Sequence, residues 1–363
     1  MRSVAARSVV LVGGGHSHVQ VLRRWAMAPP KDLRLMVVLD RPIAVYSGMV
    51  PGFVAGDYTH TELEIDVVPL ARRANAGVIL SRAVDLDPVR GEIAVEGRPP
   101  LHYDLASIDV GSTVRGLDLP GVLEHALATR PIVDFVRKVD LRIEALSALG
   151  RAGRILVAGG GTAGSELAFT LDARLRGRGL EPRISIVTAE SELLAEAGPG
   201  TRALIAREAQ RRGVETIPHR RVIRVDAGGA FLESVHGPEP DTGDEYFEAD
   251  LVIWATGADP APFPARQTAA CLPRDKQGFI EVRDSLQTVG FDDVFAAGDC
   301  ARLVNHPWVP RAGVYAVRQG PVLERNLRAR LEGRPLQSYR PQRNFLSILH
   351  LGDRGGPGYE MVR

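Results

Sequence analysis

The stretch that decides the fold is Arg154–Gly164, which reads RILVAGGGTAG. A short run of aliphatic residues leads into three glycines, and a helical pattern of apolar residues follows over Thr162–Leu175. This order predicts a buried parallel strand, a tight turn and a helix. Gly159, Gly161 and Gly164 have the spacing G-x-G-x-x-G, which allows the turn, the approach of the backbone to a pyrophosphate, and close packing of helix on strand. The stretch therefore predicts a dinucleotide-binding βαβ unit.

A second copy of this pattern lies nearer the N-terminus. The residues Ser8–His18 read SVVLVGGGHSH, and a helical pattern and a second apolar strand, Leu33–Asp40, follow them. Gly13 and Gly15 match the fingerprint, whereas its third position holds His18 instead of glycine. Recurrence of the same strand, glycine turn and helix predicts an internal duplication of one dinucleotide-binding unit.

An acidic residue at the end of the second strand often accepts hydrogen bonds from the adenosine ribose. In the first copy Asp40 stands at this place, although a solvated acid at a strand end is the alternative interpretation. In the second copy the strand Arg183–Thr188 ends without an acid, and Glu190 follows two residues later. Glu190 favours NADH over NADPH, and Thr188 weakens that preference.

Composition sets the limits on other functions. The chain has 363 residues, which suggests about two domains. The net charge of +1 argues against a broad surface for nucleic acid. Apolar runs are far shorter than the ~20 residues that cross a bilayer. Two cysteines, Cys271 and Cys300, are too few for a disulfide framework and fit a reducing, cytoplasmic compartment. The histidines show no ligand spacing, so we expect no metal site.

A third motif completes the pattern. Residues 288–299 read TVGFDDVFAAGD, and two further strands end in Gly111-Ser112 and in Ala255-Thr256-Gly257. With these motifs in order, nearly the whole chain resembles the FAD-dependent pyridine nucleotide oxidoreductases. The resemblance implies an α/β fold with two Rossmann-like three-layer domains in a glutathione-reductase-like arrangement. It places an FAD-binding domain at 1–114 plus 263–330, an NAD(P)H-binding domain at 115–262, and a short C-terminal cap or tail at 331–363.

Shorter phrases point to subgroups. The segment Tyr46–Gly56, YSGMVPGFVAG, is similar to type II NADH dehydrogenases and sulfide:quinone reductases. The phrases at 13–18, 46–49 and 314–320 resemble the flavoprotein module associated with selenide, water dikinase, in which histidine also takes the third glycine position. This second resemblance implies selenide, water dikinase as a partner.

The resemblance also implies the residues that hold the two cofactors. For FAD these are Gly13, Gly15, His16, Ser17, His18, Asp40, Arg41, Ser47, Gly48, Val84, Gly111, Ser112, Gly298, Asp299 and Gln319. For NAD(P)H they are Gly159, Gly161, Thr162, Ala163, Gly164, Glu166, Glu190, Thr256 and Gly257.

Two residues are implied in catalysis. Glu166 matches the glutamate that faces nicotinamide and flavin in type II NADH dehydrogenases, where a carboxylate can bind the carboxamide or assist proton transfer. The alternative is a first-turn glutamate stabilised by the helix dipole. Gln319 lies near the start of the predicted helix Val314–Leu331, whose positive end would stabilise a reduced flavin.

The cysteines bear on the reaction. A redox-active pair is expected in the disulfide reductases of the resembled family, and no such pair is present here. We therefore expect electrons to pass from NAD(P)H to flavin and directly to a small acceptor, with a quinone favoured. The alternatives are an FAD-binding accessory module for selenium or sulfur metabolism with little turnover, and, more weakly, a sulfide:quinone reductase that would need Cys271. No amphipathic C-terminal helix is legible, so peripheral contact with the inner face of the membrane stays open.

Overall fold

The computed structural model describes residues 6–236, 244–264, 271–344, 346–352 and 359–362. The chain forms two compact units. Unit 1 comprises Met1–Tyr46, Glu64–Thr113 and Asp259–Pro341, and unit 2 comprises Ser47–Leu63, Val114–Ala258 and Gln342–Arg363. The chain passes between the units at β10 (Ser112–Val114) and β19 (Ala258–Pro260), close to the expected domain boundaries.

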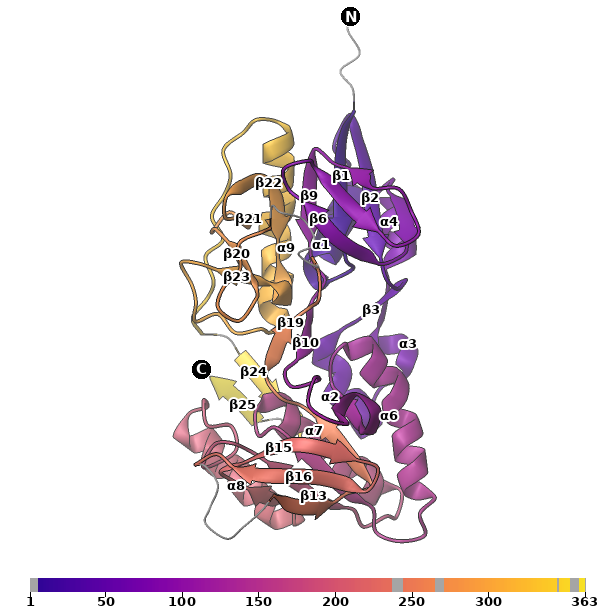
Figure 1. Ribbon diagram of the computed structural model, residues 1–363, viewed down its shortest axis with the longest axis vertical. Helices are drawn as coiled ribbons and strands as arrows, with labels where there is room; N and C mark the ends of the chain where they lie inside the picture. The colour runs from indigo at the N-terminus through magenta and orange to yellow at the C-terminus, as the bar shows by residue number, and fades with distance from the viewer. Residues whose placement is uncertain (1–5, 237–243, 265–270, 345, 353–358, 363) are drawn as a thin grey trace, which may run out of the picture. The chain divides into compact units, whose positions relative to one another are not determined.

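Unit 1 is built on an eight-stranded sheet whose order is β23-β20-β21-β22-β9-β1-β2-β5. Strands β22, β9, β1, β2 and β5 are parallel neighbours, and the first four can be followed in this order in Figure 1. The glycine turn directly follows β1. The central strand is a run of buried valine and leucine because both of its faces are covered. The bounds are β1 Arg7–Val12, β2 Leu33–Leu39, β5 Gly77–Leu80, β9 Leu105–Ile108, β20 Ile280–Val282, β21 Gln287–Thr288, β22 Phe291–Ala296 and β23 Ala301–Leu303.

Helices cover this sheet. Helix α1 packs against α9 and α4, and the indole nitrogen of Trp25 on α1 donates to the carboxylate of Glu324 on α9 at 2.9 Å. The remaining elements of the unit are small hairpins and turns. The bounds are α1 His16–Met27, β3 Ile43–Val45, β4 Glu64–Asp66, α4 Val67–Arg73, β6 Ala83–Asp87, β7 Glu92–Val95, β8 Leu101–His102, η2 Gly298–Cys300 and α9 Gly313–Leu331.

Unit 2 repeats the plan with a five-stranded parallel sheet, order β11-β18-β12-β13-β14. A three-stranded antiparallel sheet, β15-β16-β17, shares a core with it around the buried Trp254 and Val225. The bounds are β11 Ala126–Ala128, β12 Arg154–Ala158, β13 Arg183–Val187, β14 Glu215–Ile217, β15 Arg220–Asp226, β16 Gly229–Ser234, β17 Glu245–Glu248, β18 Leu251–Trp254, η1 Ser47–Met49, α2 Val50–Ala55, α3 His60–Leu63, α5 Val122–His125, α6 Ile132–Ser147, α7 Thr162–Gly177 and α8 Pro199–Arg212.

The two sheets share one strand order, which confirms the predicted duplication and the α/β fold with two Rossmann-like units. Strands β9, β1, β2 and β5 of unit 1 correspond to β18, β12, β13 and β14 of unit 2. In each copy the amide of the first glycine donates to the strand that follows the helix: Gly13 to Val38 and Gly159 to Val187, both at 2.9 Å. The same fingerprint therefore closes the same turn twice.

Two segments differ from the sequence-based division. Residues 47–63 belong to unit 2 instead of the expected FAD-binding domain, because α2 packs on α6 and α7. The expected C-terminal segment is divided, with 331–341 in unit 1 and 342–363 in unit 2. The apolar run FLSILHL (345–351) contains strand β24, Leu346–Leu349, and Phe345 lies outside the described residues. Strand β25, Tyr359–Val362, pairs antiparallel with β24.

The third fingerprint glycine offers a test of the fold. In Gly164→Ala the added methyl group would collide with the carbonyl oxygen of Gly159 and push α7 away from β12. We expect the free energy of unfolding to fall by about 1–3 kcal/mol, measured by denaturant titration. Gly177→Ala, at the other end of the same helix, meets no neighbouring atom and is the matched control. It should be neutral or stabilising by up to about 1 kcal/mol. An equal loss in both variants would contradict this role of Gly164.

Candidate functional site

Unit 1 presents the glycine turn and the helix N-terminus that the fingerprint predicts. Gly13 has a left-handed φ of +93°, and a side chain there would collide with the carbonyl oxygen of Asp109. Gly15 is the N-cap of α1 and donates its amide to the same carbonyl oxygen at 3.1 Å. His16 begins the helix and lies edge-on to Tyr46, with 5.6 Å between ring centroids. The turn thus places the first amides of α1 at the end of the parallel sheet, where anions bind.

His18 is fully buried, and its ring points into the fold. Its Nδ1 lies 2.7 Å from the carbonyl oxygen of Gly13, and its Nε2 lies 2.8 Å from the Ser107 hydroxyl. Burial lowers the pKa of this imidazole to about 4, so the ring is neutral, with Nδ1–H donating to Gly13 and Nε2 accepting from Ser107. In the structure the His18 side chain therefore braces the turn instead of facing a ligand.

Asp109 was missed by the sequence analysis. It follows β9 directly, is 2% exposed, and its Oδ2 accepts the amide of His18 at 3.0 Å. Burial raises the pKa of this carboxyl to about 7, against the hydrogen bonds from the His18 and Ser17 amides, which lower it. The only sequence signal was an acid between the short strand LASI (105–108) and the Gly111-Ser112 turn.

The remaining polar groups of unit 1 surround a small hollow beside η2. Gly298, Asp299, Arg311, Tyr315 and Gln319 are among its lining residues. The Gln319 Oε1 accepts the amide of Gly298 at 2.6 Å, and the Ser112 hydroxyl donates to Asp299 at 3.4 Å, which ties the motifs at 111–112 and 298–299 together. Gly111 has a φ of +72° and open space beside its α-carbon.

Other residues expected at the FAD site are more scattered. Asp40 follows β2, is exposed, and pairs with Arg41 at 3.2 Å. The Ser17 hydroxyl donates to the carbonyl oxygen of Ala316 at 2.8 Å and is buried there. Val84 lies in β6, away from the glycine turn in sequence and sheet. Ser47 and Gly48 belong to η1 of unit 2.

This donor set fits a flavin dinucleotide. Glycine at positions 13 and 15 keeps the turn free of side chains of its own, and Asp40 follows β2, where an acid is expected to accept hydrogen bonds from an adenosine ribose. Ser112, Asp299 and Gln319 supply hydroxyl, carboxylate and amide groups for a polyol chain and a polar ring edge. Asp299 and Gln319 also line the small hollow beside η2.

Unit 2 carries the complete fingerprint with fewer obstructions. Gly159 has a φ of +123° and packs against the carbonyl oxygen of Ala255, while Gly161 caps α7 with open space around its α-carbon. Thr162 and Ala163 form the first positions of α7. The helix N-terminus is thus available to the phosphates of a second dinucleotide.

The ribose-binding prediction in unit 2 has mixed support. Thr188 is buried, and its hydroxyl accepts the amide of Glu190 at 3.2 Å, while the Glu190 side chain is exposed. The Thr256 hydroxyl donates to the carbonyl oxygen of Arg115 at 2.6 Å, and the Arg115 amide donates to Gly257 at 2.8 Å. Thr256 and Gly257 therefore fix a strand end, and a role for them in binding stays a prediction.

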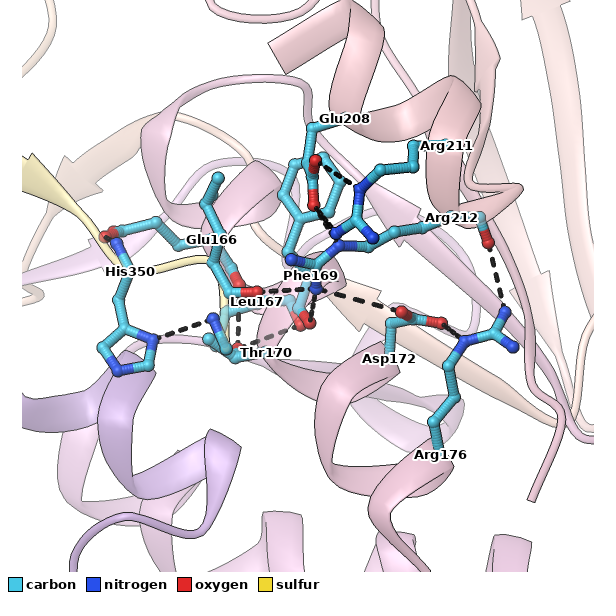
Figure 2. A network of polar contacts seen from close by, with 12 residues as sticks. Glu166, Leu167, Phe169, Thr170, Asp172, Arg176, Glu208, Arg211, Arg212 and His350 are labelled. Carbon is cyan, nitrogen blue, oxygen red and sulfur yellow. Dashed lines mark hydrogen bonds and ion pairs between the residues drawn. The ribbon is translucent and has the colours of Figure 1, made fainter. Parts of the chain in front are cut away.

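Glu166 is held by the segment Leu349–Gly352, called the strap below, which nothing in the sequence connects with it. Its Oε1 accepts the backbone amide of His350 at 2.9 Å (Figure 2). The His350 ring donates from Nε2 to Asp57 at 3.0 Å and accepts the amide of Gly352 at its Nδ1. Burial raises the pKa of Glu166 to about 7, opposed by the His350 amide. Glu166 can therefore take up or release a proton near neutral pH.

A buried arginine fixes the other side of the strap. Arg212 of α8 lies against the carboxylates of Glu208 and Asp172, and its Nη1 donates to the carbonyl oxygen of Leu351 at 2.7 Å (Figure 2). Gly352, with a φ of +79°, approaches α7 so closely that a side chain would collide with Ala173. The main chain of the strap is thus bonded to Glu166 on α7 and to Arg212 on α8.

The cysteines form no redox pair. Neither is in a disulfide bond; Cys271 is exposed and Cys300 is buried. Burial raises the pKa of the Cys300 thiol to about 12, which keeps it protonated and unreactive. Among the described residues there is no group of three or more His, Cys, Asp or Glu that could hold a metal. In the same part of the chain, no helix has the length and apolar character needed to cross a membrane.

The chain is similar in sequence to a known protein family and to several known proteins. A family model described as pyridine nucleotide-disulphide oxidoreductase matches residues 7–320. A demethylphylloquinone reductase from Synechocystis is 26% identical over 356 residues, which cover 94% of this chain and 84% of the relative. An alternative NAD(P)H-ubiquinone oxidoreductase from Arabidopsis thaliana is 25% identical over 275 residues, covering 72% of this chain and 52% of its own length. The chain thus spans about half of that relative.

A solved structure has the same fold. The NDH2 protein from Plasmodium falciparum, in complex with NADH, superimposes with a TM-score of 0.79 at 12% identity, and the match covers 98% of this chain and 91% of that one. At this identity the likeness extends to the fold alone.

Two neighbouring arginines test the strap. The Arg212 side chain is 6% exposed and Arg211 is 59% exposed, although both pair with Glu208. Arg212→Met should lower the free energy of unfolding by about 3 kcal/mol, because it removes a buried charge from between two carboxylates. Amide hydrogen exchange in Leu349–Gly352 should also become faster. Arg211→Met should cost less than about 1 kcal/mol and leave that exchange unchanged. Similar effects of the two substitutions would refute the role of Arg212.

Proposed function

This chain belongs to the pyridine nucleotide-disulphide oxidoreductase family, and from that membership we propose that it is an FAD-dependent enzyme that oxidises NAD(P)H and reduces a quinone. The observation that carries the proposal is the pair of dinucleotide-binding units in one chain, of which the first has a donor set suited to FAD. The two relatives described above are named as an NAD(P)H-ubiquinone oxidoreductase and a demethylphylloquinone reductase, which supports a quinone as the acceptor.

The lack of a cysteine pair favours direct transfer of electrons from the flavin to a small acceptor over transfer through a protein disulphide. Disulphide reduction needs two thiols that can join, whereas Cys300 is buried and Cys271 is exposed in a different environment. Electrons therefore go directly to a small acceptor. When bound, FAD would supply hydride acceptance from nicotinamide and the release of electrons to that acceptor.

The protein's own residues bind, orient and exchange protons. The amides at the start of α1 and α7 hold the phosphates, and Gln319 holds the Gly298 turn in place. Glu166 is the proton-exchanging group, since reduction of a quinone consumes protons as well as electrons. Burial raises the pKa of its carboxyl to about 7, and the hydrogen bond from the His350 amide opposes this rise, so both protonation states are accessible near neutral pH. NADH is preferred over NADPH, because Glu190 follows β13 by three residues and, with a dinucleotide bound, its carboxylate would repel a 2′-phosphate.

Two finer expectations stay predictions. The phrases shared with the dikinase-associated module still suggest a selenide, water dikinase as partner, and quinone as acceptor still suggests peripheral contact with a membrane. A cytoplasmic location stays a prediction as well.

The first test is spectroscopic. The purified protein should carry FAD, lose its yellow colour on addition of NADH without oxygen, and recover the colour when a soluble quinone is added. NADPH at the same concentration should act more slowly. A protein that takes up no FAD would overturn the proposal. Bleaching by NADH followed by negligible turnover with every quinone would favour the accessory module instead.

Glu166→Gln tests the proton-exchanging role. The folded protein raises the pKa of Glu166 from 4.5 to about 7, so the folded state binds the proton more tightly than the unfolded state. This group therefore makes stability fall as pH rises from about 4.5 to 7, and Gln should flatten that slope in denaturant titrations. Quinone turnover should drop at least about tenfold. Glu144→Gln, an exposed change on α6, is the control. Unchanged turnover and an unchanged slope would remove Glu166 from the mechanism.

A further inference from the structure

The duplicated units allow one position to be compared with its own counterpart. In unit 1 the residue after β9 is Asp109, whose amide donates to Val12 at 2.9 Å. In unit 2 the residue after β18 is Ala255, whose amide donates to Ala158 at the same distance. Each carbonyl oxygen packs against the first fingerprint glycine. Asp109 and Ala255 are therefore equivalent, and only unit 1 has a carboxyl group at this place.

The Asp109 carboxyl occupies the space next to Gly15 and Gly298 in which a glycine side chain is missing. A side chain on Gly15 would collide with both of its oxygens, and one on Gly298 would come within 2.5 Å of Oδ1. The second fingerprint glycine normally keeps this space free so that a pyrophosphate can approach the backbone. Here the space beside Gly15 contains an acid of the protein itself.

The same carboxyl takes the amides that an anion would need. Oδ2 accepts the His18 amide at 3.0 Å, and the Ser17 amide also bonds to this carboxyl. These are the second and third residues of α1, whose amides have no partner within the helix. An ionised Asp109 thus competes with a bound phosphate for the same donors and adds a like charge beside it.

Few other titratable groups face Asp109. His18 on α1 is neutral, because burial lowers its pKa to about 4, and Cys300 on η2 is protonated, because burial raises its pKa to about 12. Asp299 on η2 raises the pKa of Asp109 further, and Arg311 interacts electrostatically with Asp299 and Cys300. His16 on α1 has a pKa below its ordinary 6.5 because of burial. Asp109 is thus the group of this cluster that changes charge near neutral pH.

We propose that Asp109 is a built-in anion at the phosphate seat of unit 1, and that binding of FAD requires this carboxylate to take up one proton from solvent. The proton neutralises the carboxylate, releases its hold on the Ser17 and His18 amides, and removes the repulsion from the pyrophosphate. Asp109 is a positioning residue that makes cofactor loading depend on pH. This inference rests on FAD as the cofactor of the proposed function.

The experiment measures FAD affinity against pH by titration calorimetry of the protein stripped of flavin. In the native chain the dissociation constant should rise by up to about tenfold per pH unit above pH 7. Titrations in two buffers of different ionisation enthalpy should show an uptake that approaches one proton per FAD. Asp109→Asn, and Asp109→Ala, which copies Ala255, should bind FAD with little pH dependence and without this proton uptake. At pH 8.5 both should bind more tightly than the native chain.

Two controls separate Asp109 from its surroundings. Asp85→Asn replaces another buried acid of unit 1, on β6, and should keep the native pH dependence. His16→Gln tests the nearby histidine. Persistence of the slope in both Asp109 variants, or its loss in His16→Gln alone, would overturn the proposal. Affinity that does not change with pH in the native chain would overturn it while leaving FAD as cofactor. No FAD binding at any pH would overturn the proposed function together with this inference.

Discussion

The structure depends on one close approach, between the first glycine of each fingerprint and the backbone of the strand end beside it. Gly13 and Gly159 both adopt a left-handed φ and pack on a carbonyl oxygen, that of Asp109 in unit 1 and that of Ala255 in unit 2. The turn can then bring the start of the helix to the end of the parallel sheet. The phosphate-binding role assigned to both helix N-termini follows from that placement, since helix amides reach a phosphate only where the turn is this tight.

The two units solve the packing of helix on strand in different ways. In unit 2 Gly164 leaves no room for a side chain, so the helix lies directly on the turn. In unit 1 a full imidazole occupies the corresponding place and replaces direct contact with two hydrogen bonds, to Gly13 and Ser107. The departure from the fingerprint at His18 is therefore compensated. Hydrogen bonds of the buried imidazole hold the helix to the turn, where unit 2 relies on the close contact that glycine allows.

Local sequence patterns predicted most of the fold but only part of the candidate site. Aliphatic runs such as RILVA and the glycine turns predicted the strands, helices and duplication, because burial on both faces and positive φ leave a clear mark in a sequence. Asp109 left no such mark, since one acid after a strand is typical of a solvated end. The link between Glu166 and His350 was also out of reach, because 184 residues separate a carboxylate from a backbone amide that any residue could supply. The grouping of segment 47–63 with unit 2 was out of reach for the same reason: its partners on α6 and α7 come from distant sequence.

The strap over α7 has a consequence for how this chain can vary. Its principal bonds run from Glu166 to the amide of His350 and from Arg212 to the carbonyl oxygen of Leu351, and both are made to the main chain. Any amino acid except proline at position 350 offers the first of these atoms, and every amino acid at position 351 offers the second. These two attachments therefore tolerate sequence change at positions 350 and 351, whereas position 352 needs glycine, because a side chain there would collide with Ala173.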